Sequence, residues 1–223
     1  MRIHLLATAL LLSLALTAAA EPKRQRVVIE TDSGKIVMVL YNGTPLHRDN
    51  MIKLVKQGFY DSLLWHRVIP GFVIQGGDPD SKRAPRDKVL GDGDVGYRVP
   101  AEIKEEYYHV RGAVGMARDG NPEKASSGCQ FYIVTGKKYT DEQLDAADKR
   151  SGHKSSAAQR AAYKSLGGIP FLDGGYTVFG EVVEGMDVAE RIANAARNSA
   201  DRPNVDIRIK RAYLTKKKKF LFF

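Results

Sequence analysis

The chain has 223 residues, of which 43% are hydrophobic and 27% charged, and its formal net charge is +9. This balance is typical of a soluble globular protein, and the length suits one domain of ordinary size or at most two small ones. The basic charge admits nucleic-acid or anionic partners, but the lysines and arginines are spread along the chain, which favours a solvated surface over a nucleic-acid site. Cys129 is the single cysteine, which excludes an intramolecular disulfide, and the apolar run after it indicates an inert core thiol.

Residues 1–20 differ sharply from the rest of the chain. Arg2 is their only charge, residues 5–16 form an apolar run, and small residues follow at Ala18–Ala20. The pattern predicts a secretory signal peptide cleaved after Ala20, whereas the alternative, a transmembrane anchor, needs about 20 apolar residues and finds too few. Loss of Arg2 changes the formal charge from +9 to +8. We therefore expect an exported protein, in a bacterial periplasm or alternatively secreted or in the lumen of a secretory pathway.

Short apolar runs separated by turns follow and predict strands. Asp32-Ser33-Gly34 is typical of a hairpin with the glycine at positive φ, and Pro70-Gly71 separates another pair of runs. In the last run, Val205, Ile207 and Ile209 alternate with charged residues, as in a strand with one face in water. The number of strands, roughly eight, suggests a barrel or a sandwich. The predicted strands are 27–31, 35–41, 64–69, 72–75, 97–99, 113–117, 130–135, 177–183 and 205–214.

Two segments carry helix signals. Thr44-Pro45 is an N-cap with proline at the first helical position, and Gly58 is a stop signal, which together predict a helix over 46–57. The pattern Asp187-x-x-Glu190 resembles a capping box that opens a helix over 188–196. Two helices and about eight strands describe a mainly β barrel closed at its ends by helices.

Residues 137–168 break this rhythm, because they are polar, basic and rich in alanine. Two capping-box patterns, Thr140-x-x-Gln143 and Ser156-x-x-Gln159, predict two helices with a hinge near Ser151-Gly152, and Gly167-Gly168 closes the second. Too few apolar residues are present for a separate core. We interpret the segment as an inserted helical hairpin and not as a second domain.

The usual signatures of metal, cofactor and nucleophilic chemistry are weak. The five histidines are scattered, without the spacing of a metal-binding helix. Residues 91–96 (GDGDVG) carry two carboxylates among glycines, but the later glutamate of a calcium loop is missing, which favours a plain turn. The chain has no Gly-x-Ser-x-Gly elbow. We therefore expect neither a metal nor a cofactor.

Residues 65–79 (WHRVIPGFVIQGGDP) place an arginine and a glutamine, Arg67 and Gln75, among apolar residues on the two sides of a Pro-Gly turn. Burial of either side chain costs free energy unless a partner compensates. Rotation about an X-Pro bond needs an apolar pocket for the ring and a donor to the prolyl nitrogen, whose lone pair is free only when the bond is twisted. Such a donor stabilises the transition state and not the ground state. An apolar surface that carries Arg67 and Gln75 meets these needs.

Residues 65–78 resemble the signature segment of the cyclophilins, which are peptidyl-prolyl cis-trans isomerases built on an eight-stranded barrel capped by two helices. Further motifs stand in the family's order, namely 58–60 (GFY), 100–102 (PAE), 115–118 (GMAR), 127–134, 171–174 (FLDG) and 178–180 (VFG). The resemblance implies an isomerase domain over 21–215, with the insertion at 137–168, between the signal peptide 1–20 and a basic, aromatic tail 216–223.

The resemblance also implies roles for individual residues. By motif position, Arg67 resembles the family's catalytic arginine, with a structural ion pair as its alternative role, and Gln75 resembles the glutamine that bonds the substrate backbone and orients the arginine. Ala117 and Arg118 resemble the segment that holds the residue before proline, and the others would form the proline pocket. The implied substrate-binding residues are Phe72, Val73, Ala117, Arg118, Tyr132, Phe171, Leu172 and Tyr176.

The chain departs from the family's common pattern at several pocket positions. Phe171 replaces the tryptophan of many eukaryotic members, which argues against strong cyclosporin binding, and Val73 replaces a methionine. Tyr132 and Tyr176 stand where phenylalanine and histidine are common, and each brings a hydroxyl that needs a partner.

The function implied is a folding catalyst that acts on X-Pro bonds of exported proteins, as a monomer with proline-containing polypeptides as substrates and no nucleic-acid partner. The alternative is a binding module or holdase for proline-containing segments, with incidental turnover. The insertion 137–168 is either a lid or partner surface of the pocket or a tolerated extension. The tail, with Lys216–Lys219 before four apolar residues, adds the hypothesis of weak contact with an anionic membrane surface.

Overall fold

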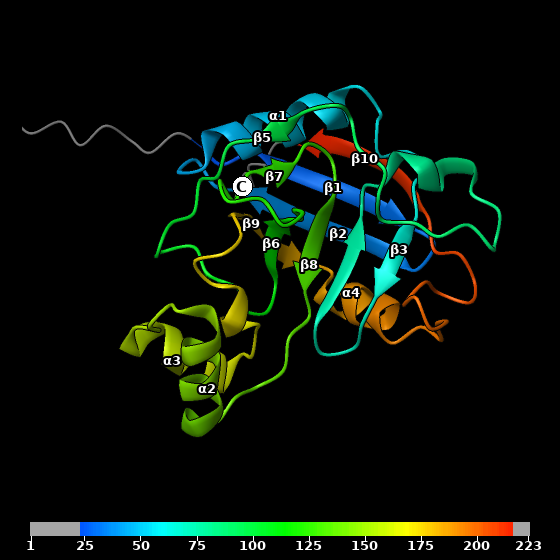
Figure 1. Ribbon diagram of the computed structural model, residues 1–223. Helices are drawn as coiled ribbons and strands as arrows, with labels where there is room; N and C mark the ends of the chain where they lie inside the picture. Colours follow the sequence, from blue (N-terminus) through cyan, green and yellow to red (C-terminus); the bar gives the residue numbers. More distant parts are fainter. Residues whose placement is uncertain (1–22, 216–223) are drawn as a thin grey trace, which may run out of the picture.

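The computed structural model describes residues 23–215, so the predicted signal peptide and the tail 216–223 lie outside the described residues. Eight strands form one curled antiparallel sheet in the order β10-β1-β2-β9-β6-β8-β4-β3. The two ends of the sheet approach one another, since the backbone N–H of Trp65 donates to the Ile207 carbonyl at 3.0 Å. The predicted eight-stranded architecture is therefore confirmed, as a half-barrel with helices (Figure 1).

The strands of this sheet are short, and a separate pair forms a small second sheet. Their bounds are β1 Arg26–Thr31, β2 Gly34–Leu40, β3 Trp65–Val68, β4 Val73–Gly76, β6 Ala113–Met116, β8 Phe131–Val134, β9 Val178–Glu184 and β10 Ile209–Thr215, with β5 Arg98–Val99 and β7 Ser126–Ser127 in the second sheet. The helices are α1 Pro45–Lys56, α2 Asp141–Ser151, α3 Ala157–Ser165 and α4 Met186–Ala193, with single 3-10 turns at η1 Pro79–Arg83 and η2 Pro170–Leu172. No helix among residues 23–215 has the length and apolarity needed to cross a membrane.

The strands near the centre of the sheet are buried on both faces, which explains their unbroken apolar sequences. In β8, Phe131 and Ile133 point into the main core with α1 and α4, whereas Tyr132 and Val134 point to a second cluster on the opposite face. Figure 1 shows α1 and α4 at opposite sides of the sheet, with the inserted helices apart from both. The second cluster is the apolar surface on which the candidate site is built.

Helix α1 begins at the predicted proline, but its cap differs from the prediction, because the Thr44 side chain makes no capping hydrogen bond. The carboxylate of Glu102 instead accepts from the backbone N–H groups of Leu46 at 3.1 Å and His47 at 2.9 Å. A negative charge at this position satisfies free N–H groups and suits the helix dipole. The acid that caps α1 therefore comes from a distant loop.

Helix α4 corrects the second capping prediction. It starts at Met186, so Asp187 lies inside the first turn and accepts from Arg191 at 2.7 Å without capping the helix. The helix ends at Ala193. The preceding Gly185 has a φ of +89°, and a Cβ there would lie 2.2 Å from the Lys35 carbonyl oxygen of β2. Only glycine therefore fits the turn that leads into the helix.

Strand β10 begins later than predicted. It starts at Ile209, because Asp206 accepts from the buried Arg202 at 3.1 Å and holds the preceding residues in a loop. Val205, predicted to alternate into the core, is 79% exposed. The period-two pattern over 205–209 was therefore a loop pattern and not that of a strand.

The insertion forms the predicted helical hairpin. Both capping boxes are present, with Thr140 and Gln143 at the start of α2 and Ser156 and Gln159 at the start of α3. Gly152 ends α2 in the left-handed conformation at a φ of +69°. Figure 1 shows α2 and α3 side by side next to the β6 and β8 end of the sheet, far from α1.

Candidate functional site

Strand register places four residues of the site in one row. Arg67 of β3 lies opposite Gln75 of β4, Gln75 lies opposite Tyr132 of β8, and Tyr132 lies opposite Gly115 of β6. Residues that pair directly in neighbouring strands point to the same face of a sheet. The two polar residues of segment 65–79 therefore share a direction with Tyr132, toward the second apolar cluster.

Gly115 makes room for the Tyr132 ring. A Cβ at this position would lie 2.3 Å from the Tyr132 side chain. The ring therefore lies across β6 where any larger residue would push it away. Its own hydroxyl lies 2.8 Å from His109 Nε2, so the polar group that tyrosine brings to this position has a partner.

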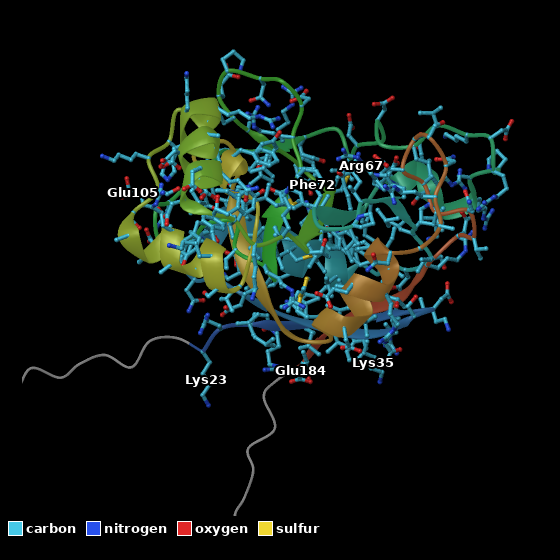
Figure 2. The ribbon with its side chains drawn as sticks, turned by 90° about the horizontal axis from the view of Figure 1, so that it is seen from below. Lys23, Lys35, Arg67, Phe72, Glu105 and Glu184 are labelled. Carbon is cyan, nitrogen blue, oxygen red and sulfur yellow. The ribbon has the colours of Figure 1, made fainter. Side chains whose placement is uncertain are left out.

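Arg67 is held at the edge of the cluster by several weak contacts. Its Nη1 lies 3.5 Å from Gln75 Oε1, its Nε lies 3.8 Å from Asp201 Oδ2, and its Cζ lies 5.8 Å from the centre of the Phe72 ring. The side chain remains 42% exposed. Figure 2 shows Arg67 and Phe72 near one another, on the side of the molecule away from Lys35 and Glu184. The guanidinium therefore keeps donors free for a bound group.

A chain of amides fixes the orientation of Gln75. Gln130 Nε2 donates to the carbonyls of Gly91 and Gly93, both at 2.8 Å, so its oxygen is left as an acceptor. That oxygen accepts from Gln75 Nε2 at 3.0 Å, which turns the Gln75 oxygen toward Arg67. Each amide has only one orientation that satisfies both of its ends.

A pocket opens beside this row. Its volume is about 320 Å³, enough for a small apolar ring and its flanking backbone. Seven of the eight implied substrate-binding residues belong to the second apolar cluster. The residues that line the pocket are His66, Arg67, Phe72, Val73, Gln75, Leu90, Gly91, Asp92, Ala117, Arg118, Tyr132, Leu172, Tyr176 and Ala200.

Phe171 is the one residue of the predicted site that is not among the lining residues. Its ring stacks on Phe72 with centroids 5.9 Å apart and planes at 11°. The Arg150 guanidinium of α2 also lies over this ring, 4.3 Å from its centre. Phe171 therefore supports Phe72 and links the pocket to the insertion.

Arg118 holds two loops together at the mouth of the pocket. Its Nε donates to the Gly175 carbonyl at 2.7 Å, and its Cζ lies 4.8 Å from the centre of the Tyr176 ring. A second hollow of about 830 Å³ begins here. The lining residues that it shares with the pocket are Gln75, Gly91, Asp92, Ala117 and Arg118. The two hollows therefore adjoin one another, and Arg118 lines both of them.

Sequence reasoning missed three residues of the site: Gln130, Asp201 and His66. Gln130 stood inside a predicted strand and Asp201 in a distant loop, so neither gave a local signal. His66, which precedes Arg67, is buried, and neither ring nitrogen has a hydrogen-bond partner among residues 23–215. Burial lowers the pKa of His66 to about 4, so the ring is neutral at physiological pH. The sequence signal for His66 was its position next to Arg67 in an otherwise apolar run.

A serine, a histidine and a carboxylate also meet elsewhere, but without access. His47 lies 2.7 Å from Glu102 Oε2 and 3.0 Å from Ser126 Oγ. Both His47 and Ser126 are fully buried, and burial lowers the pKa of His47. The cluster joins three segments: α1, strand β7 and the loop that precedes β6. Because it is buried, it cannot receive a substrate.

The remaining candidate positions are structural. Cys129 is buried, and burial raises the pKa of its thiol to about 11, which leaves it unreactive at neutral pH. Residues 91–96 form a turn whose carbonyls accept from Gln130, and no group of three potential metal ligands occurs among residues 23–215.

Known proteins are similar to this chain in sequence and in fold. The family model described as "Cyclophilin type peptidyl-prolyl cis-trans isomerase/CLD" matches residues 26–214. A protein of Staphylococcus saprophyticus, whose name marks it as a candidate peptidyl-prolyl cis-trans isomerase, is 31% identical over 186 residues, which cover 82% of this chain and 88% of the relative. A candidate bifunctional phosphatase/peptidyl-prolyl cis-trans isomerase of Streptococcus pyogenes is 34% identical over 187 residues. That match covers 82% of this chain but spans only 37% of the Streptococcus protein.

Solved structures show the same fold. The crystal structure of a cyclophilin-type peptidyl-prolyl cis-trans isomerase of Cryptosporidium parvum has a TM-score of 0.66 at 24% identity, over 87% of this chain and 99% of that chain. A second structure of the Cryptosporidium protein, in the presence of the dipeptide Ala-Pro, has a TM-score of 0.65.

Proposed function

The chain belongs to the cyclophilin-type peptidyl-prolyl cis-trans isomerases, and from this premise we propose that Arg67 accelerates rotation about X-Pro bonds of exported polypeptides bound in the adjoining pocket. The observation that carries the proposal is the row Arg67–Gln75–Tyr132, which sets a cationic donor at the rim of an apolar pocket. The proline ring binds in the apolar part of this pocket, which excludes water from it. The residues that contact the ring are Phe72, Val73, Tyr132 and Leu172.

The geometry supports a division of roles between Arg67 and Gln75. The guanidinium faces the prolyl nitrogen, whose lone pair becomes an acceptor when rotation removes amide resonance. Gln75, held by Gln130, keeps the guanidinium in place and offers a polar group to the substrate backbone. Because the hydrogen bond to nitrogen forms only in the twisted state, it lowers the barrier without tightening ground-state binding.

One charge-assisted hydrogen bond contributes about 1.5–3 kcal/mol, or roughly ten- to a hundredfold in rate. The rest of the acceleration comes from desolvation of the twisted bond and from its positioning in the pocket. No step requires a proton transfer or a covalent intermediate.

Export is part of the proposal and rests on residues 1–20, whose apolar run and small residues before Glu21 have the pattern of a cleaved signal peptide. In a periplasm or secretory lumen, the substrates are newly exported chains with slow X-Pro bonds. Mass spectrometry of the protein from an exporting host tests this part, and a mature chain that starts at Glu21 is expected. A retained Met1–Ala20 segment would contradict it.

The isomerase assay tests the activity. A short X-Pro peptide should isomerise faster with wild-type protein than without, and Arg67→Ala should remove most of that acceleration. The matched control is Arg191→Ala, because Arg191 is an exposed arginine of α4 that pairs with Asp187. Equal activity of wild type and Arg67→Ala would overturn the proposed mechanism. If Arg67→Ala instead still rescued a folding defect, the holdase function would be favoured.

A further inference from the structure

Four buried polar side chains run from the insertion to the pocket. Tyr163 of α3 donates to Asp173 Oδ2 at 2.5 Å, and Asp173 Oδ1 lies 2.7 Å from His109 Nδ1. His109 Nε2 lies 2.8 Å from the hydroxyl of Tyr132, which lines the pocket. All four residues are at most 4% exposed. Each polar atom therefore depends on its hydrogen-bonded partner among the four and not on bulk water.

With His109 in its neutral form, the partners assign a direction to every hydrogen bond. The Asp173 carboxylate also accepts from the backbone N–H of His109 at 2.9 Å, so it is an acceptor throughout and Nδ1 carries the imidazole proton. The bare Nε2 then accepts from the Tyr132 hydroxyl. Burial raises the pKa of both tyrosines well above the ordinary value, which keeps their hydroxyls as donors. Removal of one member leaves a buried group unpaired and affects the next.

Further contacts dock the insertion against the segment that carries the pocket residues 171–176. Arg150 of α2 lies over the Phe171 ring, which stacks on Phe72. Gly168, the last residue of the insertion, lies against the backbone of His109, since a Cβ at 168 would be 2.3 Å from the His109 carbonyl oxygen. None of the residues that line the pocket comes from 137–168. The insertion therefore reaches the pocket from behind its lining and not across its opening.

We propose that Tyr163 is a positioning residue for the substrate pocket, because it fixes the Tyr132 ring through Asp173 and His109. The insertion thereby sets the distance between this ring and Arg67, which stands in the same row of the sheet. The inference rests on the proposed function and deepens it, since it assigns the insertion a role in that same site.

A double-mutant cycle in the X-Pro peptide assay tests the coupling. Tyr163→Phe removes one hydroxyl from the insertion, and Tyr132→Phe removes the hydroxyl at the pocket end. We expect Tyr163→Phe to lower kcat/KM roughly tenfold in the wild-type background and to have little further effect once Tyr132 is phenylalanine. Tyr139→Phe, in the same insertion but outside the chain of hydrogen bonds, is the matched control and should leave kcat/KM unchanged. Urea unfolding of each variant separates activity from stability.

If Tyr163→Phe lowered kcat/KM by the same factor in both backgrounds, the inference would be overturned. A change in the free energy of unfolding with no change in kcat/KM would also overturn it. The ¹⁵N signals of the His109 ring give a second test on the wild-type protein, which does not depend on any variant folding. A protonated Nδ1 with a bare Nε2 is expected. The opposite tautomer would contradict the proposed series of hydrogen bonds from Tyr163 to Tyr132. If wild type is no more active than Arg67→Ala, the proposed function fails instead, and the dissociation constant of the peptide in the same cycle then tests the positioning role.

Discussion

Arg67 and Gln75 stand out in the sequence because each is a polar residue inside an apolar run, and the structure places them opposite one another in a strand pair. Sequence reasoning did not reach the residues that hold them. Gln130 contacts Gln75 across 55 positions of the chain, and Asp201 approaches Arg67 from the loop before β10. Hydrogen bonds between distant loops leave no periodic signal, so such supporting residues appear only in the folded chain.

Gly115 offers a residue-scale prediction. In Gly115→Ala the new methyl would lie 2.3 Å from Tyr132. The ring must move, so we expect the free energy of unfolding to fall by about 1–3 kcal/mol, as for other overpacked sites. The same movement should lower kcat/KM for an X-Pro peptide. Urea unfolding and the isomerase assay measure the two effects.

The matched control is Gly120→Ala, because a Cβ at 120 meets no atom within 4 Å. We expect this variant to behave like wild type in both measurements. If the two substitutions had equal effects, Gly115 would not be needed to seat the tyrosine ring.

The elements show which signals are local. The two capping boxes of the insertion were predicted correctly because both partners lie within one helical turn. Thr44 holds the predicted N-cap position of α1, but its side chain makes no capping hydrogen bond, and Glu102 from a distant loop accepts from the first amides instead. Asp187 was wrong as a cap because α4 begins one residue before it, with Gly185 at the N-cap position. Where a cap comes from another part of the chain, the local sequence gives a plausible but incorrect alternative.

Glu102 gives a prediction at the scale of an element. In Glu102→Ala the first amides of α1 lose their acceptor, and the buried His47 ring loses its partner at 2.7 Å. Loss of a helix cap costs about 0.5–2 kcal/mol, and the unpaired ring adds to that. We expect the urea midpoint to fall with an unchanged slope. Glu123→Ala, at an exposed acid, is the control, and an equal decrease there would argue against a capping role.

The insertion supports the pocket as a unit. Deletion of 138–165 removes Tyr163 and Arg150, so we expect pocket residues to become mobile and turnover to decrease. Unchanged client binding and turnover after the deletion would leave the insertion as a tolerated extension.

At the scale of the whole molecule, the eight-stranded fold followed from the turn spacing and from the family motifs, and the structure confirms it. Several predicted strands were unbroken apolar runs. The sequence did not show why, because the second apolar cluster forms only when β4, β6, β8 and the segment 169–178 meet. The start of β10 was misplaced because Arg202 and Asp206 pair in the loop before it.

Buried histidines make the stability of the whole molecule dependent on pH. As the pH falls, the unfolded chain takes up a proton at His66 near the ordinary pKa of 6.5, whereas the folded chain does so only near 4. The unfolded state therefore binds more protons between these values, and stability is lost as the pH decreases through this window. His47, whose pKa burial also lowers, acts in the same direction.

We expect His66 alone to lower the free energy of unfolding by about 1.5 kcal/mol between pH 6.5 and 5. Urea unfolding at several pH values measures this slope. In His66→Asn the free energy of unfolding should depend less steeply on pH, with that contribution missing. The same pH dependence as in wild type would show that His66 is not buried in its neutral form.

The role of Arg67 is tested by measuring turnover and binding separately in Arg67→Ala. NMR exchange on an X-Pro peptide gives the rate of interconversion in the bound state, and titration gives the dissociation constant. Because the hydrogen bond to the prolyl nitrogen exists only in the twisted state, we predict that the bound-state rate falls about ten- to a hundredfold while the dissociation constant changes by less than about threefold. A dissociation constant that rises in proportion, with the bound-state rate unchanged, would contradict the account and make Arg67 a binding residue.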